Sequence, residues 1–468
     1  MIIYDGGKTV VFSSILFLFR FLPIAFLIYY LTPKKFKNFV LLILSLFFYG
    51  WGEPKYLPIM LYSTVLDYSC SIGISRFRES KALKKMFLSF SLVGNLGMLF
   101  FFKYTNFFVS NINTLLSTEI PLLSLALPLG ISFYTFQTMS YTIDVYRGKV
   151  EAEKNIINLG AFVVLFPQLI AGPIVKYSDI SNELKTRRVD LVQIEDGIRL
   201  FIMGLASKVL LANNIGALWT EVEALNILSI SSGLAWLGII AFSFQIYFDF
   251  SGYSLMAIGL GKMLGFNFPQ NFNYPYISKS ITEFWRRWHM TLSSWFKEYL
   301  YIPLGGNRVS VPRNYLNLLI VWFCTGFWHG ANWNFILWGI FFFVVLVIEK
   351  KFLLKGLERS KVISRIYVIF LLILSWTLFA ITDFTTLLNY FKKMFDFTGG
   401  IDWVYYLRNY GVTLILCAIF STPLLKNIYE KFIKDRPILK TVLLGVLLTF
   451  SVAYLVDASY NPFLYFRF

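Results

Sequence analysis

The stretch Leu234-Ala-Trp-Leu-Gly-Ile-Ile-Ala-Phe-Ser-Phe-Gln-Ile-Tyr-Phe248 carries no charged side chain and a single amide, Gln245. A helix of about 20 mostly apolar residues crosses the hydrocarbon core of a bilayer, and long apolar runs recur along the chain. The pattern predicts an all-α polytopic integral membrane protein, a helical bundle with about 10–12 spans. The other runs lie at residues 10–31, 39–48, 57–75, 86–102, 315–328, 335–348, 366–381, 412–425 and 441–456.

The composition supports a lipid environment. Of 468 residues, 57% are hydrophobic and 15% are charged, whereas about a quarter of the residues are charged in an average soluble domain. The formal net charge of +17 does not indicate nucleic-acid binding, because the basic residues concentrate in short loops between apolar runs. We therefore expect the lipid bilayer to surround the chain, and we expect no nucleic-acid partner.

The distribution of the basic loops predicts the orientation in the membrane. Residues 34–37 and 76–85 are rich in Lys and Arg, whereas residues 50–56 between them carry one acid and one base. The positive-inside rule places basic loops in the cytoplasm, and residues 350–365 and 426–440 continue the alternation. The pattern predicts a multi-pass protein of the cell (plasma) membrane with its N-terminus and C-terminus outside.

Interruptions of the apolar pattern divide a single membrane domain, residues 1–468, into three parts. Residues 1–104 are expected to form peripheral scaffold spans, and residues 346–468 are expected to form C-terminal spans. Residues 105–345 contain prolines and glycines within shorter apolar pieces. Irregular backbone is tolerated at membrane depth only where protein buries it or where it lines a cavity. We expect re-entrant or half-helices around a central tunnel in this part.

Two polar side chains, Gln245 and Asp249, stand four residues apart in an apolar run. This spacing places them on one face of a helix. A carboxylate inside the membrane is costly and faces the protein interior by default. The pair is therefore either a structural hydrogen-bonding contact to a neighbouring helix or part of a substrate-binding lining.

The chain has only two histidines, His289 and His329, and both lie among tryptophans. Helical spacing would align His289 with Arg286 and Ser293. His329 ends an apolar run between Gly326 and Gly330, and these glycines would let backbone or a substrate approach closely.

Histidine can accept and return a proton near neutral pH. As a general base it could deprotonate a hydroxyl that attacks an acyl carbonyl, an effect of roughly 10²–10⁴ in rate. The alternative is that both histidines are buried packing residues. No metal is expected, because two histidines without HExxH or a compact set of carboxylates do not form a zinc-site pattern.

The segment around His289 is also basic, with Arg286 and Arg287 next to Trp285 and with Lys297 further on. Arginine offers a planar fork that matches phosphate oxygens, so some of these cations could bind the phosphates of a nucleotide-bearing donor. The other interpretation is the positive-inside rule alone. The sequence contains neither a Walker nor a GxGxxG pattern that would indicate an ATP motor or a Rossmann cofactor.

The motifs around the histidines, with several others, form a recognisable set. They are Trp285-Arg-Arg-Trp-His289, Leu292-Ser-Ser-Trp-Phe296, Tyr301-Ile-Pro-Leu-Gly-Gly306, Phe327-Trp-His-Gly330, Phe335-Ile-Leu-Trp-Gly339, Val11-Phe-Ser-Ser14, Phe47-Phe-Tyr-Gly-Trp-Gly52, Phe166-Pro-Gln-Leu-Ile-Ala-Gly-Pro173, Tyr247-Phe-Asp-Phe-Ser-Gly-Tyr253 and Asn461-Pro-Phe-Leu-Tyr-Phe-Arg-Phe468. The set resembles the membrane-bound O-acyltransferase (MBOAT) family, in particular the alginate O-acetyltransferase subunit type. One position departs from that type, because Leu255 stands where an aspartate is usual.

The resemblance implies that His329 is the catalytic histidine and that His289 lines the same path through the membrane. His329 would act as general base, while His289 and Arg286 would position the donor or stabilise the oxyanion. The remaining candidates for substrate binding are Arg287, Trp285, Ser293, Asn332, Asp249 and Gln245.

The resemblance also implies the substrates. The donor would be acetyl-CoA or another acyl thioester on the cytoplasmic side, with no tightly bound cofactor. The acceptor would lie outside the cytoplasm, and an exported SGNH-like acyltransferase partner would pass the acyl group to a cell-envelope polysaccharide.

Three alternatives remain at this point. The first is D-alanyl transfer to teichoic acid from a thioester-charged carrier protein. The second is a transporter or channel in which the histidines relay protons. The third is a structural membrane protein without activity.

Overall fold

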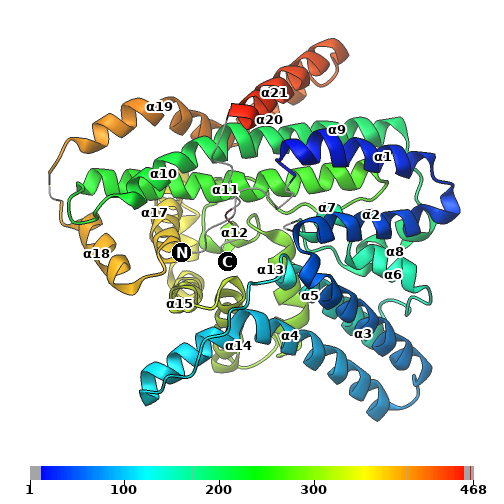
Figure 1. Ribbon diagram of the computed structural model, residues 1–468. Helices are drawn as coiled ribbons and strands as arrows, with labels where there is room; N and C mark the ends of the chain where they lie inside the picture. The colour runs from blue at the N-terminus through cyan, green and yellow to red at the C-terminus, as the bar shows by residue number, and fades with distance from the viewer. Residues whose placement is uncertain (1–11, 171, 398, 458–463, 465–468) are drawn as a thin grey trace. The chain divides into compact units, whose positions relative to one another are not determined.

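The computed structural model describes residues 12–170, 172–397, 399–457 and 464, and its regular secondary structure within these ranges is helical (Figure 1). The predicted all-α fold class is confirmed. Seven helical stretches of the described chain are long and apolar enough to cross a membrane, which makes this a polytopic membrane protein. They are Pro54–Arg76, Lys81–Leu116, Leu191–Ala224, Ser232–Met263, Lys361–Ala380, Asp402–Phe420 and Pro437–Asp457.

Seven is smaller than the expected number of spans, and short helices explain the difference. Helices α2 (Lys37–Gly52), α5 (Ile131–Arg147) and α15 (Trp333–Ile348) have 16, 17 and 16 residues. At a rise of about 1.5 Å per residue, such helices reach only about 25 Å. The central tunnel, the position of the termini and the division at residues 104 and 345 stay predictions.

The chain forms two compact units, each made of two segments. The first unit comprises residues 1–201 and 256–269. Within it, α3 (Leu57–Arg76), α4 (Lys81–Leu116) and α5 pack against one another (Figure 1). Its other helices are α1 (Leu22–Leu31), α2, α6 (Ile156–Val163), α7 (Phe166–Leu169), α8 (Tyr177–Thr186), most of α9 (Leu191–Ala206) and the end of α11 (Ser232–Met263).

A buried carboxylate connects the three long helices of the first unit. Asp67 on α3 is fully buried and accepts hydrogen bonds from Ser91 and Asn95 on α4 and from Thr142 on α5. The Asn95 and Thr142 donors lie 2.9 and 3.0 Å from its oxygens. Because a buried carboxylate is costly unless donors surround it, this cluster favours one relative arrangement of the three helices.

The second unit comprises residues 202–255 and 270–468. Helices α14 (Val311–His329) and α15 form its most extensively packed pair. A Cβ at Gly326 would overlap the carbonyl of Phe335, and one at Gly339 would overlap the carbonyl of Trp322. Small residues at such a crossing let two helices approach closely in a membrane. The other helices are α10 (Asn214–Ala224), α12 (Ile281–Trp285), α13 (Met290–Phe296), α16 (Leu354–Leu357), α17 (Lys361–Ala380), α18 (Phe384–Phe395), α19 (Asp402–Phe420), α20 (Leu424–Phe432) and α21 (Pro437–Asp457).

A buried ion pair lies in the second unit. A π-helical segment, η4 (Ser207–Asn213), follows α9 and contains Lys208, whose Nζ lies 2.6 Å from a carboxylate oxygen of Asp249 on α11. The other oxygen of Asp249 accepts the backbone N–H of Leu464 at 2.8 Å. These contacts agree with the structural interpretation of Asp249.

Some predicted features lie outside the described residues. They include the start of the first apolar run, Val11 of the first motif and Ala171 of the motif that begins at Phe166. The same holds for the C-terminal motif that begins at Asn461, apart from Leu464.

Candidate active site

His289 occupies an unusual backbone position between two short helices. Helix α12 ends at Trp285, helix α13 begins at Met290, and His289 between them has φ 42° and ψ 54°. Left-handed geometry at a residue other than glycine costs roughly 1–3 kcal/mol and is concentrated at functional sites. Helical spacing was predicted to align His289 with Arg286. This prediction is wrong, because the left-handed backbone of His289 interrupts the helix.

The side chain of Asn271 holds the His289 ring. Asn271 Oδ1 lies 3.0 Å from His289 Nδ1 and 2.9 Å from Thr291 Oγ1. Its Nδ2 lies 2.9 Å from Ser254 Oγ on α11. Asn271 therefore fixes the direction of an imidazole that is 0% exposed.

His329 is the last residue of α14 and is also buried, with 5% of its surface exposed. Its ring stands edge-on to Trp338 and Phe379, with centroids 5.0 and 5.3 Å away. Gly330 follows in extended conformation, and a Cβ there would overlap the ring of Phe335. The close approach that the glycines were expected to allow is thus made by α15.

The two histidines flank a single indole. The ring centroid of Trp328 lies 6.1 Å from that of His289 and 5.0 Å from that of His329. Phe250 closes another side of His289, with a centroid distance of 4.7 Å. The structure therefore brings together the two residues that the sequence predicts as catalytic.

The C-terminal end of α15 anchors the segment that precedes His289. Glu349, which directly follows α15, is 0% exposed and accepts the backbone N–H groups of Ile281 and Thr282 at 2.7 and 2.8 Å. Thr282 Oγ1 adds a third hydrogen bond at 2.6 Å. The first N–H groups of a helix have no partner within it, so Glu349 fixes the beginning of α12.

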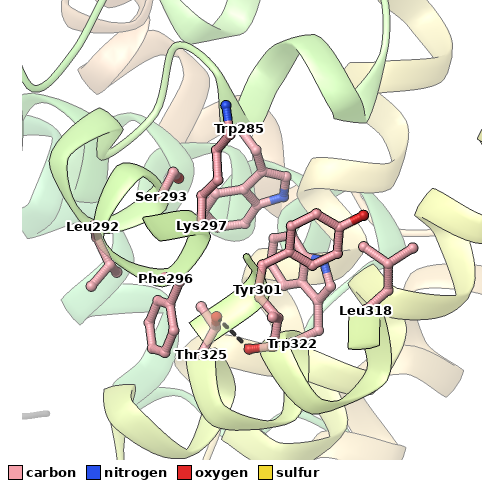
Figure 2. A pocket seen from close by; sticks show the side chains of 10 residues that line it. Trp285, Leu292, Ser293, Phe296, Lys297, Tyr301, Leu318, Trp322 and Thr325 are labelled. Carbon is pink, nitrogen blue, oxygen red and sulfur yellow. Dashed lines mark hydrogen bonds between the residues drawn. The ribbon is translucent and has the colours of Figure 1, made fainter. Parts of the chain in front are cut away.

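A cavity of about 150 Å³ lies in the same unit (Figure 2). Ser293, one helical turn after His289, lines it, and so does Thr325, one turn before His329. The exposed Lys297 contributes the one charged side chain of the lining. The rest of the lining consists of Trp285, Leu292, Phe296, Tyr301, Leu318, Val321 and Trp322. The lining is thus mostly apolar with one cationic side chain at an exposed position.

The cavity contains two of the predicted substrate-binding residues, Trp285 and Ser293. The neighbouring arginines lie outside its lining. Arg286 is exposed, whereas Arg287 forms an ion pair with Glu283 at 2.8 Å.

The other predicted substrate-binding residues also lie outside the lining of this cavity. Asn332 is the N-cap residue of α15 and is half-buried. Gln245 packs against Gly216 of α10, and Asp249 pairs with Lys208. Both side chains therefore lie on one face of α11, as their spacing predicts.

Sequence reasoning missed Asn271 and Glu349. Asn271 stands in the polar segment Gln270-Asn-Phe-Asn-Tyr274, and Glu349 is the first charged residue after a long apolar run. Neither pattern distinguishes an anchoring residue from an ordinary loop residue. Among the described residues, no group of three or more His, Cys, Asp or Glu side chains could hold a metal ion.

The fold defines the class of polytopic helical membrane proteins, and sequence comparison identifies the family. Residues 79–355 match the membrane-bound O-acyltransferase family, MBOAT. This match covers more than half of the chain, and the chain belongs to that family. The protein is an acyltransferase.

The chain is also similar to individual proteins that are named for acyl transfer. The chain is 41% identical to a probable alginate O-acetylase of Pseudomonas aeruginosa over 392 residues, 83% of this chain and 75% of the relative. It is 33% identical to the peptidoglycan O-acetyltransferase of Helicobacter pylori, over 98% of this chain and 97% of the relative. It is 31% identical to the teichoic acid D-alanyltransferase of Streptococcus thermophilus, over 50% of this chain and 59% of the relative.

Proposed function

We propose that the protein is an O-acetyltransferase that moves an acetyl group from a cytoplasmic thioester, acetyl-CoA, to an acceptor outside the cytoplasm. The observation that carries this proposal is the pair of buried histidines, His289 directly before α13 and His329 at the end of α14. Both helices contribute to the lining of one cavity, although neither histidine does. The similarity to O-acetylating relatives over most of the chain supports acetyl as the transferred group.

The reaction needs an acyl donor, an acceptor hydroxyl and a group that accepts the hydroxyl proton. A hydroxyl oxygen of the acceptor attacks the thioester carbonyl carbon while His329 takes the hydroxyl proton. The tetrahedral oxyanion then collapses, the C–S bond breaks, and the leaving sulfur receives the proton from His329. The products are the O-acetyl ester and the free thiol.

The cavity supports a donor that enters from the basic side of the protein. An acyl thioester arm is slender and mostly apolar, and Lys297 could bind a phosphate at its other end. Lys350 Nζ donates a hydrogen bond to Asn314 Oδ1 at 3.3 Å, so the first residue of the basic segment 350–365 lies beside the residue that follows Arg313. The positive-inside rule assigns this basic part of the chain to the cytoplasm.

The proposal for the acceptor is based on the relatives, whose names refer to alginate, peptidoglycan and teichoic acid. We propose that this chain serves O-acetylation of a cell-envelope polysaccharide, together with an exported SGNH-like partner that receives the acyl group.

Radiolabelled acetyl-CoA offered to the purified protein in proteoliposomes tests the proposal. Wild-type protein should release CoA and pass label to a polysaccharide acceptor or to an added partner, whereas His329→Ala should not. Full transfer by His329→Ala, or no consumption of acetyl-CoA by the wild type in the presence of acceptor, would contradict it.

D-alanyl transfer from a thioester-charged carrier protein is the second candidate. The similarity to a D-alanyltransferase over half of the chain favours it. A carrier protein charged with labelled D-alanine, offered in the same proteoliposomes, separates the two candidates, because a D-alanyltransferase would use the carrier and leave acetyl-CoA intact. The transporter interpretation finds no support in the family, because its members are acyltransferases.

A further inference from the structure

The hydrogen bonds of Asn271 determine which way its amide points. The Oδ1 atom lies 3.3 Å from the backbone nitrogen of Thr291, whereas Nδ2 lies 2.9 Å from Ser254 Oγ. A backbone N–H can only donate, and a hydroxyl oxygen can accept. The oxygen of the amide therefore faces Thr291 and His289, and its NH₂ group faces Ser254.

This orientation also determines the tautomer of His289. A carbonyl oxygen only accepts, so the imidazole nitrogen 3.0 Å from it, Nδ1, must carry the hydrogen. In a neutral imidazole the other nitrogen then has the lone pair. The bond that one ring nitrogen makes thus decides the role of the other nitrogen.

We propose that Asn271 is a positioning residue that holds His289 with its hydrogen on Nδ1, so that His289 enters acyl transfer as a hydrogen-bond acceptor at Nε2. The proposal rests on the proposed function. This tautomer narrows the roles that are open to His289, because its neutral ring cannot donate a hydrogen bond from Nε2 to an oxyanion. The Nε2 atom of His289 can instead accept a hydrogen bond, either from the acceptor hydroxyl or from a protonated His329.

The same residue supports the strained backbone of His289. The backbone oxygen of Asn271 accepts the N–H of Met290 at 2.9 Å, directly after the left-handed residue. Side chain and main chain of Asn271 therefore act together on both the ring and the backbone of His289. A residue needed only for packing would not require both contacts.

Nitrogen-15 NMR of histidine-labelled protein tests the tautomer without any activity assay. The chain has two histidines, so His329→Gln leaves His289 as the only labelled ring. The inference expects a protonated Nδ1 and an unprotonated Nε2 in this variant, and a mixture of tautomers when Asn271→Leu is added. A hydrogen on Nε2 with Asn271 intact would overturn it.

Kinetics then test the role. Asn271→Leu should lower kcat by about 10–100-fold, the loss found when the hydrogen-bond partner that orients a functional imidazole is removed, with little change in KM. Asn271→Asp retains the acceptor and should restore part of kcat. Because a carboxylate beside Nδ1 favours the imidazolium and raises the pKa of His289, the acidic limb of its rate profile should move to higher pH.

The matched control is Asn273→Leu, the same change two residues further on at an exposed side chain. Equal kcat for the Asn271→Leu and Asn273→Leu proteins would contradict the inference, as would an Asn271→Asp protein with neither rescue nor a shifted pH profile. If wild-type protein transfers no acyl group, the proposed function fails, and the NMR result still decides the tautomer.

Discussion

Two buried polar clusters, one in each unit, differ in what surrounds them. Around Asp67, three donors on two neighbouring helices surround a carboxylate within regular helices. His289 and His329 lie among aromatic rings at helix ends, and the backbone of His289 is strained. The adjoining helices, α13 and α14, both contribute to the lining of a cavity. A fully bonded group in regular structure stabilises the fold, whereas strain beside a cavity indicates chemistry.

The largest expected effect comes from the histidine cluster. His329→Gln, which keeps most of the volume of the buried side chain, should lower kcat by about 10²–10⁴-fold, because a general base contributes that much, while the thermal unfolding midpoint changes little. Acetyl transfer and thermal unfolding in detergent, measured on the same preparation, check this. Cys324→Ala, on the same helix and outside the cavity lining, is the control and should retain activity.

The opposite pattern is expected for the carboxylate cluster. Asp67→Ala leaves Ser91, Asn95 and Thr142 without their shared acceptor and should destabilise the protein by about 3 kcal/mol, the cost of losing bonds to a buried charge. Activity per folded molecule should stay near that of the wild type. Asp67→Asn keeps one acceptor oxygen, so its free energy of unfolding should lie between those of the wild type and Asp67→Ala. Loss of kcat in a well-folded Asp67→Asn protein would break the comparison.

A smaller effect on activity is expected at the anchor of α12. Glu349→Gln places an NH₂ group against N–H donors and should lower kcat by about tenfold, on the scale of one lost charged hydrogen bond. The segment around His289 should shift locally, while the free energy of global unfolding should change little. Hydrogen exchange of residues 281–290, compared with the exposed control Glu358→Gln, measures this. Unchanged exchange together with unchanged kcat would show that the anchor is dispensable.

The smallest expected effect is at the rim of the cavity. Lys297→Ala should raise KM for the thioester by less than about tenfold at low salt, and high salt should reduce the difference, because an exposed charge is screened. Lys279→Ala, an exposed lysine outside the cavity lining, is the control. A KM independent of residue 297 at low ionic strength would remove Lys297 from the donor site.

Apolar runs predicted the fold class, because the length and composition of a span are local properties. The pairing of the histidines was predicted only through the resemblance of the motifs to a known family. Helix periodicity placed Gln245 and Asp249 on one face of α11 correctly. It failed for Arg286, because the left-handed turn at His289 has no local signal: neither glycine nor asparagine stands there. Asn271 and Glu349 reach their partners through chain folding over 18 and 68 positions, and a single sequence does not reveal such contacts.

The ion pair between Lys208 and Asp249 has a consequence for how the protein is made. Each residue lies in a different membrane-spanning stretch, and either charge alone at the centre of a span costs about 2.5–3.5 kcal/mol on insertion. The ribosome delivers Lys208 first, so its stretch is poorly matched to lipid until Asp249 emerges 41 residues later. The two stretches therefore enter the bilayer most favourably as a hairpin, leaving the insertion machinery together.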